Sequence, residues 1–99
     1  MGKIKNIYII VPAYNEECVI RSTIESLEKY FENIIVVNDG STDNTMQELS
    51  NSNIILINHP INLGVGATIQ TGFKFILDHC KDVAGIITFD ADGQHQISE

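Results

Sequence analysis

Residues 34–43 read Ile-Ile-Val-Val-Asn-Asp-Gly-Ser-Thr-Asp, a run of β-branched residues that ends abruptly in polar and turn-forming ones. The same change, from a short apolar run to Pro, Asn or Asp, occurs three more times in the chain. The four apolar runs are residues 7–11, 34–37, 54–57 and 84–89. Continuous apolar runs, unlike alternating ones, indicate strands that are covered on both faces, as in a parallel sheet.

Helical patterns separate the four runs. Apolar residues three and four positions apart, or a capping Ser41 or Thr42, predict helices over residues 19–31, 41–49 and 66–80. The resulting order is β-α-β-α-β-α-β. With right-handed crossovers, this order predicts an α/β fold with an open, doubly wound parallel sheet.

No helical pattern follows the fourth run, and the chain ends at Glu99. A sheet without that helix has an uncovered edge and part of an uncovered face. We therefore expect residues 1–99 to be the N-terminal part of a longer protein. The alternative is a complete minimal domain that a partner chain covers. Uncovered apolar surface also leads us to expect self-association into a homo-oligomer.

The charge balance excludes several classes of protein. The chain has 6 Lys and Arg against 13 Asp and Glu, a net charge of −7, which disfavours binding to nucleic acid or to an anionic membrane surface.

The apolar runs are far shorter than the roughly 20 residues that span a bilayer. The first run ends at Pro12, too early for a secretory signal. Cys18 and Cys80 form no metal-binding pair, and we expect a cytoplasmic protein with reduced thiols.

Polar segments follow all four apolar runs. They read Pro-Ala-Tyr-Asn-Glu-Glu (12–17), Asn-Asp-Gly-Ser-Thr-Asp (38–43), Asn-Leu-Gly-Val-Gly (62–66) and Asp-Ala-Asp-Gly-Gln-His (90–95). In a doubly wound sheet, ligands bind at the carboxyl ends of the strands. Each segment alone fits turn or capping chemistry. Four together, three of them with carboxylates, favour a ligand site.

Asp90 and Asp92 form the sharpest pair of candidate ligands. A spacing of two in an extended chain points both carboxylates to the same side. Two such charges repel each other unless a cation or proton lies between them, and Mg²⁺ or Mn²⁺ suits oxygen ligands of this kind. Gln94 can add a carbonyl oxygen. The alternative is a solvated acidic turn.

Asp39 is a candidate for binding a nucleotide base, because a carboxylate accepts hydrogen bonds and donates none. It can read the imide N–H of uracil or the N1–H and amino group of guanine. It can also cap the helix that follows, and the two roles are compatible. Gly64 to Gly66 resembles a dinucleotide fingerprint, but the third glycine is replaced by Ile69. The loop can still face an anion, or it can be a plain turn.

The histidines are interpreted as peripheral. His59 and His79 have the pattern of loop and surface residues. His95 lies beside the acidic pair, where it can touch a substrate or simply be exposed.

Taken together, the four polar segments resemble the family 2 glycosyltransferases, in particular the dolichol-phosphate mannosyltransferase-like and undecaprenyl-phosphate sugar transferase branch. The resemblance implies a GT-A fold, Rossmann-like, with strand order 3-2-1-4 and truncated after the Asp-x-Asp motif. Residues 1–99 would then be the nucleotide-sugar-binding N-terminal part of the transferase domain. The residues implied to bind the nucleotide are Pro12, Ala13, Tyr14, Glu16, Asp39, Gly66, Asp90 and Ala91. Asp90 and Asp92 would be catalytic and would bind Mg²⁺ or Mn²⁺, with Gln94 as a further metal ligand.

The implied reaction is inverting transfer of a sugar from a UDP- or GDP-sugar to an acceptor such as a polyprenyl phosphate. The metal would stabilise the departing diphosphate. In the family the catalytic base and any membrane segment follow the Asp-x-Asp motif, so we expect little activity from this chain alone. The longer protein is expected at the cytoplasmic face of the membrane.

Two other classes of function remain open. One is a nucleotide-binding module without turnover. The other is a phosphatase-like α/β domain that uses an Asp-x-Asp motif. In that class the acidic pair follows the first strand, whereas here it follows the fourth, which counts against it.

Overall fold

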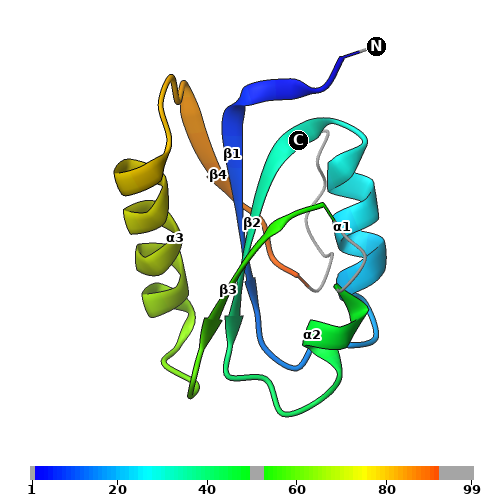
Figure 1. Cartoon of the computed structure of the whole chain (residues 1–99). Helices are drawn as coiled ribbons and strands as arrows, with labels where there is room; N and C mark the ends of the chain where they lie inside the picture. Colours follow the sequence, from blue (N-terminus) through cyan, green and yellow to red (C-terminus); the bar gives the residue numbers. More distant parts are fainter. Residues whose placement is uncertain (1, 50–52, 92–99) are drawn as a thin grey trace.

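Four parallel strands in the order β3-β2-β1-β4 form the sheet, with helices on both of its faces (Figure 1). The computed structural model describes residues 2–49 and 53–91. The elements along the chain are β1 (Ile4–Ala13), α1 (Ile20–Glu28), β2 (Phe31–Asp39), α2 (Thr45–Glu48), β3 (Ile55–His59), α3 (Val65–His79) and β4 (Gly85–Thr88). The predicted α/β class, the parallel sheet and the strand order 3-2-1-4 are confirmed.

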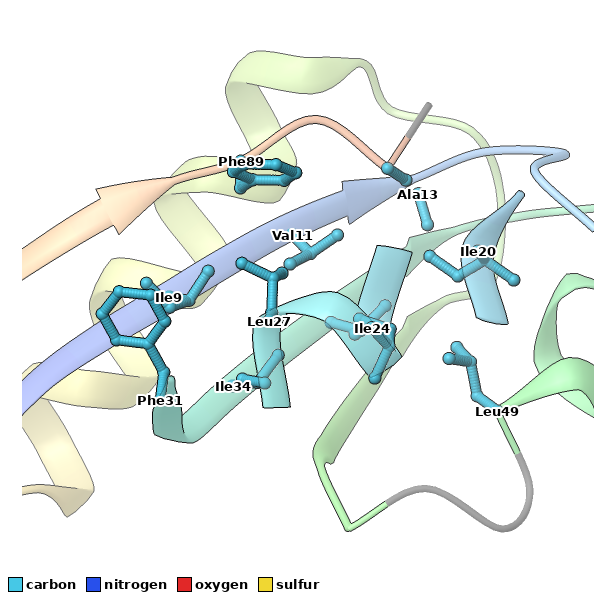
Figure 2. Packing of buried hydrophobic residues seen from close by; sticks show 12 residues of the cluster. Ile9, Val11, Ala13, Ile20, Ile24, Leu27, Phe31, Ile34, Leu49 and Phe89 are labelled. Carbon is cyan, nitrogen blue, oxygen red and sulfur yellow. The ribbon is translucent and has the colours of Figure 1, made fainter. Parts of the chain in front are cut away.

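Alternate residues of β1 face the two sides of the sheet, which explains why the apolar runs are continuous. Ile9 and Val11 pack with the apolar stripe of α1, and Ile10 packs with Ile76 of α3. The α1 side holds twelve buried residues, which Figure 2 draws as sticks. Complete burial of one such isoleucine or leucine contributes about 1.5–3 kcal/mol.

Helix α3 packs closely against the inner strand β1 at Gly72. A Cβ placed on Gly72 would come within 2.8 Å of the Ile10 side chain. Any larger residue at position 72 would therefore push α3 away from β1. This close contact fixes the position of α3, whose N-terminal end lies beside the carboxyl ends of the strands (Figure 1).

Two predicted helix boundaries are wrong. Helix α1 ends at Glu28, and Phe31 begins β2, where it packs into the same cluster as the α1 stripe. The side chain of Phe31 shares this layer, so it extended the helical spacing without belonging to the helix. Helix α2 begins only at Thr45, and neither Ser41 nor Thr42 caps it.

The outer strands of the sheet are β3 and β4. Phe73 and Leu77 on α3 and Ile87 on β4 are exposed apolar residues, so self-association stays a prediction. Within residues 2–49 and 53–91, no helix is both long enough and apolar enough to span a membrane.

Candidate functional site

A pocket of about 380 Å³ lies at the carboxyl end of the sheet. Its walls come from the ends of β1 and β2, from the loop that leads into α3, and from the segment after β4. Its lining residues are Pro12, Ala13, Tyr14, Glu16, Asp39, Asn62, Gly64, Val65, Thr68, Asp90 and Ala91. This volume is within the range of small-molecule sites.

The structure brings together most of the residues that the sequence implicated. Those of the predicted nucleotide-binding set that line the pocket are Pro12, Ala13, Tyr14, Glu16, Asp39, Asp90 and Ala91. Gly66 is exposed in the first turn of α3, and the neighbouring Gly64 and Val65 line the pocket in its place. The binding roles of all these residues stay predictions.

Part of the predicted site lies outside the residues that the structure describes. Asp92, Gln94 and His95 fall in this group. Of the predicted metal ligands, the structure therefore places only Asp90.

The loop after β1 is tied to the loop after β2. Asn15 has a φ of 53°, a left-handed conformation that asparagine tolerates. Its N–H donates to Ser41 Oγ at 3.0 Å, and its Oδ1 accepts the N–H of Thr42 at 2.8 Å. These contacts hold Tyr14 and Glu16, the neighbours of Asn15, at the pocket.

Asp43 also links the loop after β2 to the loop after β1. Its carboxylate accepts the N–H of Thr45 at 2.9 Å and that of Glu17 at 3.3 Å. Burial would raise the pKa of Asp43, but the hydrogen bonds from Thr45 and Glu17 outweigh it and lower the pKa. Asp43 thus satisfies the backbone at the start of α2, the task that the sequence had suggested for Ser41 or Thr42.

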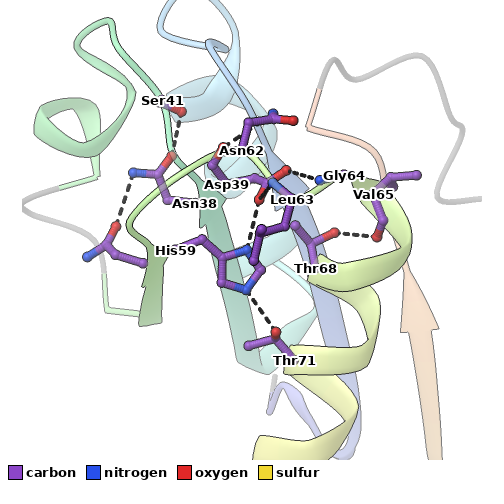
Figure 3. A network of polar contacts seen from close by, with 11 residues as sticks. Asn38, Asp39, Ser41, His59, Asn62, Leu63, Gly64, Val65, Thr68 and Thr71 are labelled. Carbon is purple, nitrogen blue, oxygen red and sulfur yellow. Dashed lines mark hydrogen bonds and ion pairs between the residues drawn. The ribbon is translucent and has the colours of Figure 1, made fainter.

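Asp39 is held by three donors in the wall of the pocket (Figure 3). Only 3% of the residue is exposed. Its Oδ1 accepts hydrogen bonds from His59 Nδ1 at 2.8 Å and the Leu63 N–H at 2.9 Å, and its Oδ2 accepts the Gly64 N–H at 2.8 Å. Burial alone would raise the pKa of Asp39, but these hydrogen bonds lower it. The carboxylate is therefore ionised at neutral pH.

The suggestion that Asp39 caps the helix after β2 is wrong. Asp39 contacts the next helix, α3, through Gly64, the residue that precedes its first turn. A helix N-terminus attracts negative charge, and here the carboxylate of Asp39 supplies it. The anion that the glycine loop faces is thus a side chain of the protein.

Gly40 allows the two loops to approach each other. Its φ is +71°, and a Cβ at this position would lie 2.5 Å from the carbonyl carbon of Ile61. Glycine is required here for both conformation and space. The close approach brings the 61–64 segment onto Asp39.

His59 is a functional candidate that the sequence interpretation missed. Its side chain is only 9% exposed, not on the surface, and both ring nitrogens are engaged. Nδ1 contacts Asp39, and Nε2 lies 2.8 Å from Thr71 Oγ1 on α3 (Figure 3). One signal could have revealed it: Asn38-Asp39 and Asn58-His59 end adjacent strands at equivalent positions, and both pairs are in register.

Asp90 carries a carboxylate, which is the kind of side chain that can serve as one ligand of a hard cation. Asp90 is exposed at the pocket, where Glu16 also lies. Among residues 2–49 and 53–91, His, Cys, Asp and Glu form no cluster of three that could hold a metal ion. Carboxylate oxygens suit Mg²⁺ or Mn²⁺, which keep waters and share a phosphate with the protein.

A match to a family model shows that the chain is a member of a known enzyme family. Residues 8–98 match the model described as glycosyl transferase family 2. The chain belongs to this family, as the resemblance of its four polar segments implied.

Two relatives illustrate the family. The chain is 42% identical to the UDP-N-acetylglucosamine–dolichyl-phosphate N-acetylglucosaminyltransferase of Methanococcus voltae, over 92% of this chain and 43% of the relative. It is also 42% identical to a dolichyl-phosphate beta-glucosyltransferase of Trichomonas vaginalis, over 91% of this chain and 31% of the relative. The chain thus spans less than half the length of these curated relatives.

A solved structure confirms the GT-A type of fold. It is glucosyl-3-phosphoglycerate synthase from Mycobacterium tuberculosis, in complex with Mn²⁺, UDP and glucosyl-3-phosphoglycerate. The match has a TM-score of 0.68 and 23% identity, and covers 87% of this chain and 33% of the synthase.

Proposed function

We propose that residues 1–99 are the donor-binding N-terminal part of an inverting glycosyltransferase that takes its sugar from a UDP-sugar. One observation carries the proposal. A single pocket holds a buried, ionised Asp39 beside β1 and an exposed Asp90 on the other side of that strand. The relative from Methanococcus voltae, whose name includes UDP-N-acetylglucosamine as donor, supports uracil over guanine.

Asp39 is proposed to read the base. A carboxylate offers about four acceptor positions, and three are occupied by His59, Leu63 and Gly64. The remaining position belongs to Oδ2, which accepts one hydrogen bond while Oδ1 accepts two. It can accept the imide N–H of uracil. The ring nitrogen N1 of adenine is itself an acceptor and would oppose the carboxylate.

The segment after β1 is proposed to form the rest of the nucleoside pocket. Pro12, Ala13, Tyr14 and Glu16 line it, and the hydrogen bonds of Asn15 and Asp43 hold their loop before any ligand arrives. Such preorganisation lowers the entropic cost of binding.

Asp90 is proposed to bind a divalent cation together with Asp92 and Gln94. A bound Mg²⁺ or Mn²⁺ would neutralise the diphosphate of the donor and stabilise it as a leaving group. Asp90 itself places a carboxyl group in the lining of the pocket. Without a cation, acidic side chains in this lining would disfavour the diphosphate.

The acceptor is proposed to be a polyprenyl phosphate, because two relatives carry dolichyl phosphate in their names. Attack by the phosphate oxygen from the side opposite the diphosphate would invert the anomeric carbon. We propose that the longer protein works at the cytoplasmic face of a membrane. No residue among those described is proposed as the catalytic base.

Calorimetric titration of the chain with UDP, GDP and ADP, each with and without Mn²⁺, tests the donor proposal. We expect UDP to bind at least tenfold more tightly than ADP, because an unpaired buried polar group costs about 1–3 kcal/mol. We also expect Mn²⁺ to strengthen UDP binding. ADP binding as tight as UDP binding, or UDP binding that ignores Mn²⁺, would contradict the proposal.

A further inference from the structure

The contacts of Asp39 restrict its carboxylate to one orientation. Oδ1 accepts two hydrogen bonds and Oδ2 accepts one. Two of the three donors are backbone N–H groups of Leu63 and Gly64. The third, His59, is the only side chain in the described part of the chain that donates to the carboxylate of Asp39, since Asn62 Nδ2 donates to the backbone carbonyl. Its removal would free one position on Oδ1 and leave a single backbone N–H on each oxygen, so the carboxylate would be held less tightly.

The tautomer of His59 follows from the chemistry of its partners. The pKa of Asp39 is lowered, so its carboxylate is ionised and can only accept. His59 Nδ1 must therefore carry a hydrogen. Nε2 contacts the hydroxyl of Thr71, which can donate to a neutral ring or accept from a charged one. Either way, Thr71 on α3 fixes the plane of the ring.

These contacts join three elements at one point. Asp39 ends β2, His59 ends β3, and Thr71 lies in the second turn of α3. The pair Asp39 and His59 is in register on adjacent parallel strands. Their side-chain exposures are 4% and 9%, so the Asp39–His59 contact is shielded from water and is not weakened as a surface ion pair would be.

We propose that His59 is a positioning residue for nucleotide selection. It holds the carboxylate of Asp39 so that the open acceptor position of Oδ2 meets the imide N–H of uracil. His59 is not among the pocket-lining residues, so it would act through Asp39 and not by direct contact with the nucleotide. This inference rests on the proposed binding of a UDP-sugar, and it makes His59 a determinant of base selectivity.

The ratio of the affinities for UDP and CDP tests the proposal. Uracil and cytosine have the same size, but N3 of cytosine is an acceptor and would face the carboxylate of Asp39. The wild-type chain should bind UDP about tenfold more tightly than CDP. His59→Gln should reduce this ratio to about threefold or less, because its amide cannot take the place of Nδ1 beside Asp39.

Two variants serve as controls. His59→Asn places its amide nitrogen near the position of Nδ1, and it should keep most of the selectivity. His79→Gln changes an exposed histidine of α3 that contacts the Phe75 carbonyl, and it should leave the ratio unchanged. A purely structural role of His59 would lower the melting temperature without changing the ratio in the folded protein, and this result would overturn the proposal.

A measurement on the wild-type chain needs no variant. Long-range ¹H–¹⁵N correlation spectra report which ring nitrogen of each histidine carries a hydrogen. We expect Nδ1 of His59 to be protonated at neutral pH, with and without UDP. The tautomer with hydrogen on Nε2 alone would overturn the proposal, because its Nδ1 lone pair would face the Asp39 carboxylate.

The outcomes separate this inference from the proposed function. Selectivity for UDP that persists in His59→Gln overturns the role of His59 alone. Equal wild-type affinity for UDP and CDP overturns it together with the proposed reading of uracil by Asp39, and Mn²⁺ still strengthening UDP binding would then leave only the proposed cation site standing. No binding of UDP at all would overturn both.

Discussion

Asp39 and Asp90 line the same pocket on either side of β1, yet their surroundings differ. Asp39 is 3% exposed and accepts hydrogen bonds from His59, Leu63 and Gly64. Asp90 follows β4 and is exposed. The Asp39 carboxylate is buried among its donors before a ligand arrives, whereas Asp90 is exposed to solvent.

This difference matches two kinds of recognition. A planar base is selected by the direction of its hydrogen bonds, which requires a carboxylate that cannot rotate. A hydrated cation needs oxygen ligands that leave room for water and phosphate. From their burial we expect Asp39 to contribute more to the stability of the fold than Asp90 does.

Replacing each of the two aspartates by alanine should reveal the largest difference between them, in the free energy of unfolding. Asp39→Ala leaves three donors without an acceptor, and it should lower the free energy of unfolding by about 3 kcal/mol or more, since each unpaired buried group costs about 1–3 kcal/mol. Asp90→Ala, at an exposed position, should lower it by clearly less than Asp39→Ala does. Urea unfolding followed by circular dichroism measures both. An equal loss of unfolding free energy in the two variants would contradict the proposed difference between Asp39 and Asp90.

Separating the loops on the Asp39 side should have the next largest effect. In Gly40→Ala the new methyl group would lie 2.5 Å from the Ile61 backbone at a φ of +71°, and we expect a loss of about 2 kcal/mol. The 61–64 segment must also move away from Asp39, so the preference for UDP over CDP should fall. The control is Gly66→Ala, where nothing lies within 4 Å of the new Cβ, and it should be neutral or stabilising. An unchanged preference in Gly40→Ala would show that this segment does not position Asp39.

The dependence of UDP binding on the cation should be affected only by the Asp90 side. Mn²⁺ should strengthen binding to the wild-type chain by about tenfold, or about 1.4 kcal/mol. Asp90→Asn should abolish this effect, and a chelator should reverse it in the wild type. Asp39→Asn should weaken UDP binding but keep the ratio between the two conditions. Calorimetry measures the UDP affinity of each variant with and without Mn²⁺. If Mn²⁺ still strengthens UDP binding in Asp90→Asn, the assignment of Asp90 as a cation ligand is contradicted.

The loss of folding stability at acid pH should depend on Asp39. Its pKa in the folded chain is lower than that of an unfolded aspartate, about 3.9. Its stabilising contribution is therefore complete above that value and is lost as the pH falls towards the lowered pKa. Asp39→Asn should make the decline of stability with falling pH shallower. Asp43→Asn should do the same, because the pKa of Asp43 is also lowered. A decline as steep as that of the wild type would contradict this role of Asp39.

The sequence predicted the sheet well, for a physical reason. Runs such as residues 34–37 need cover on both faces, and only the parallel arrangement provides it. The strand ends then had to meet, which placed Asp39 and Asp90 at one edge. The exact limits of the helices were harder to predict, because Phe31 joins the apolar layer of α1 from the start of a strand.

The missed contacts depend on residues far apart in sequence. Asp43 pairs with the backbone of Glu17, and His59 pairs with Asp39 and Thr71. Patterns within a single segment do not predict such pairs, since each residue alone fits a loop, and only a comparison of the strand ends 38–39 and 58–59 gives a signal for His59. Only the register of β2 against β3 brings Asp39 and His59 together.

One measurement tests most directly whether a single pocket holds the base at Asp39 and the cation at Asp90. Amide spectra of the ¹⁵N-labelled chain are recorded with UDP alone and then with traces of paramagnetic Mn²⁺. We expect UDP to shift the amides of Leu63 and Gly64, and Mn²⁺ to broaden those of Asp90 and Ala91 only when UDP is present. Shifts and broadening outside the pocket, or Mn²⁺ broadening around Leu63 and Gly64 in place of Asp90, would contradict the account.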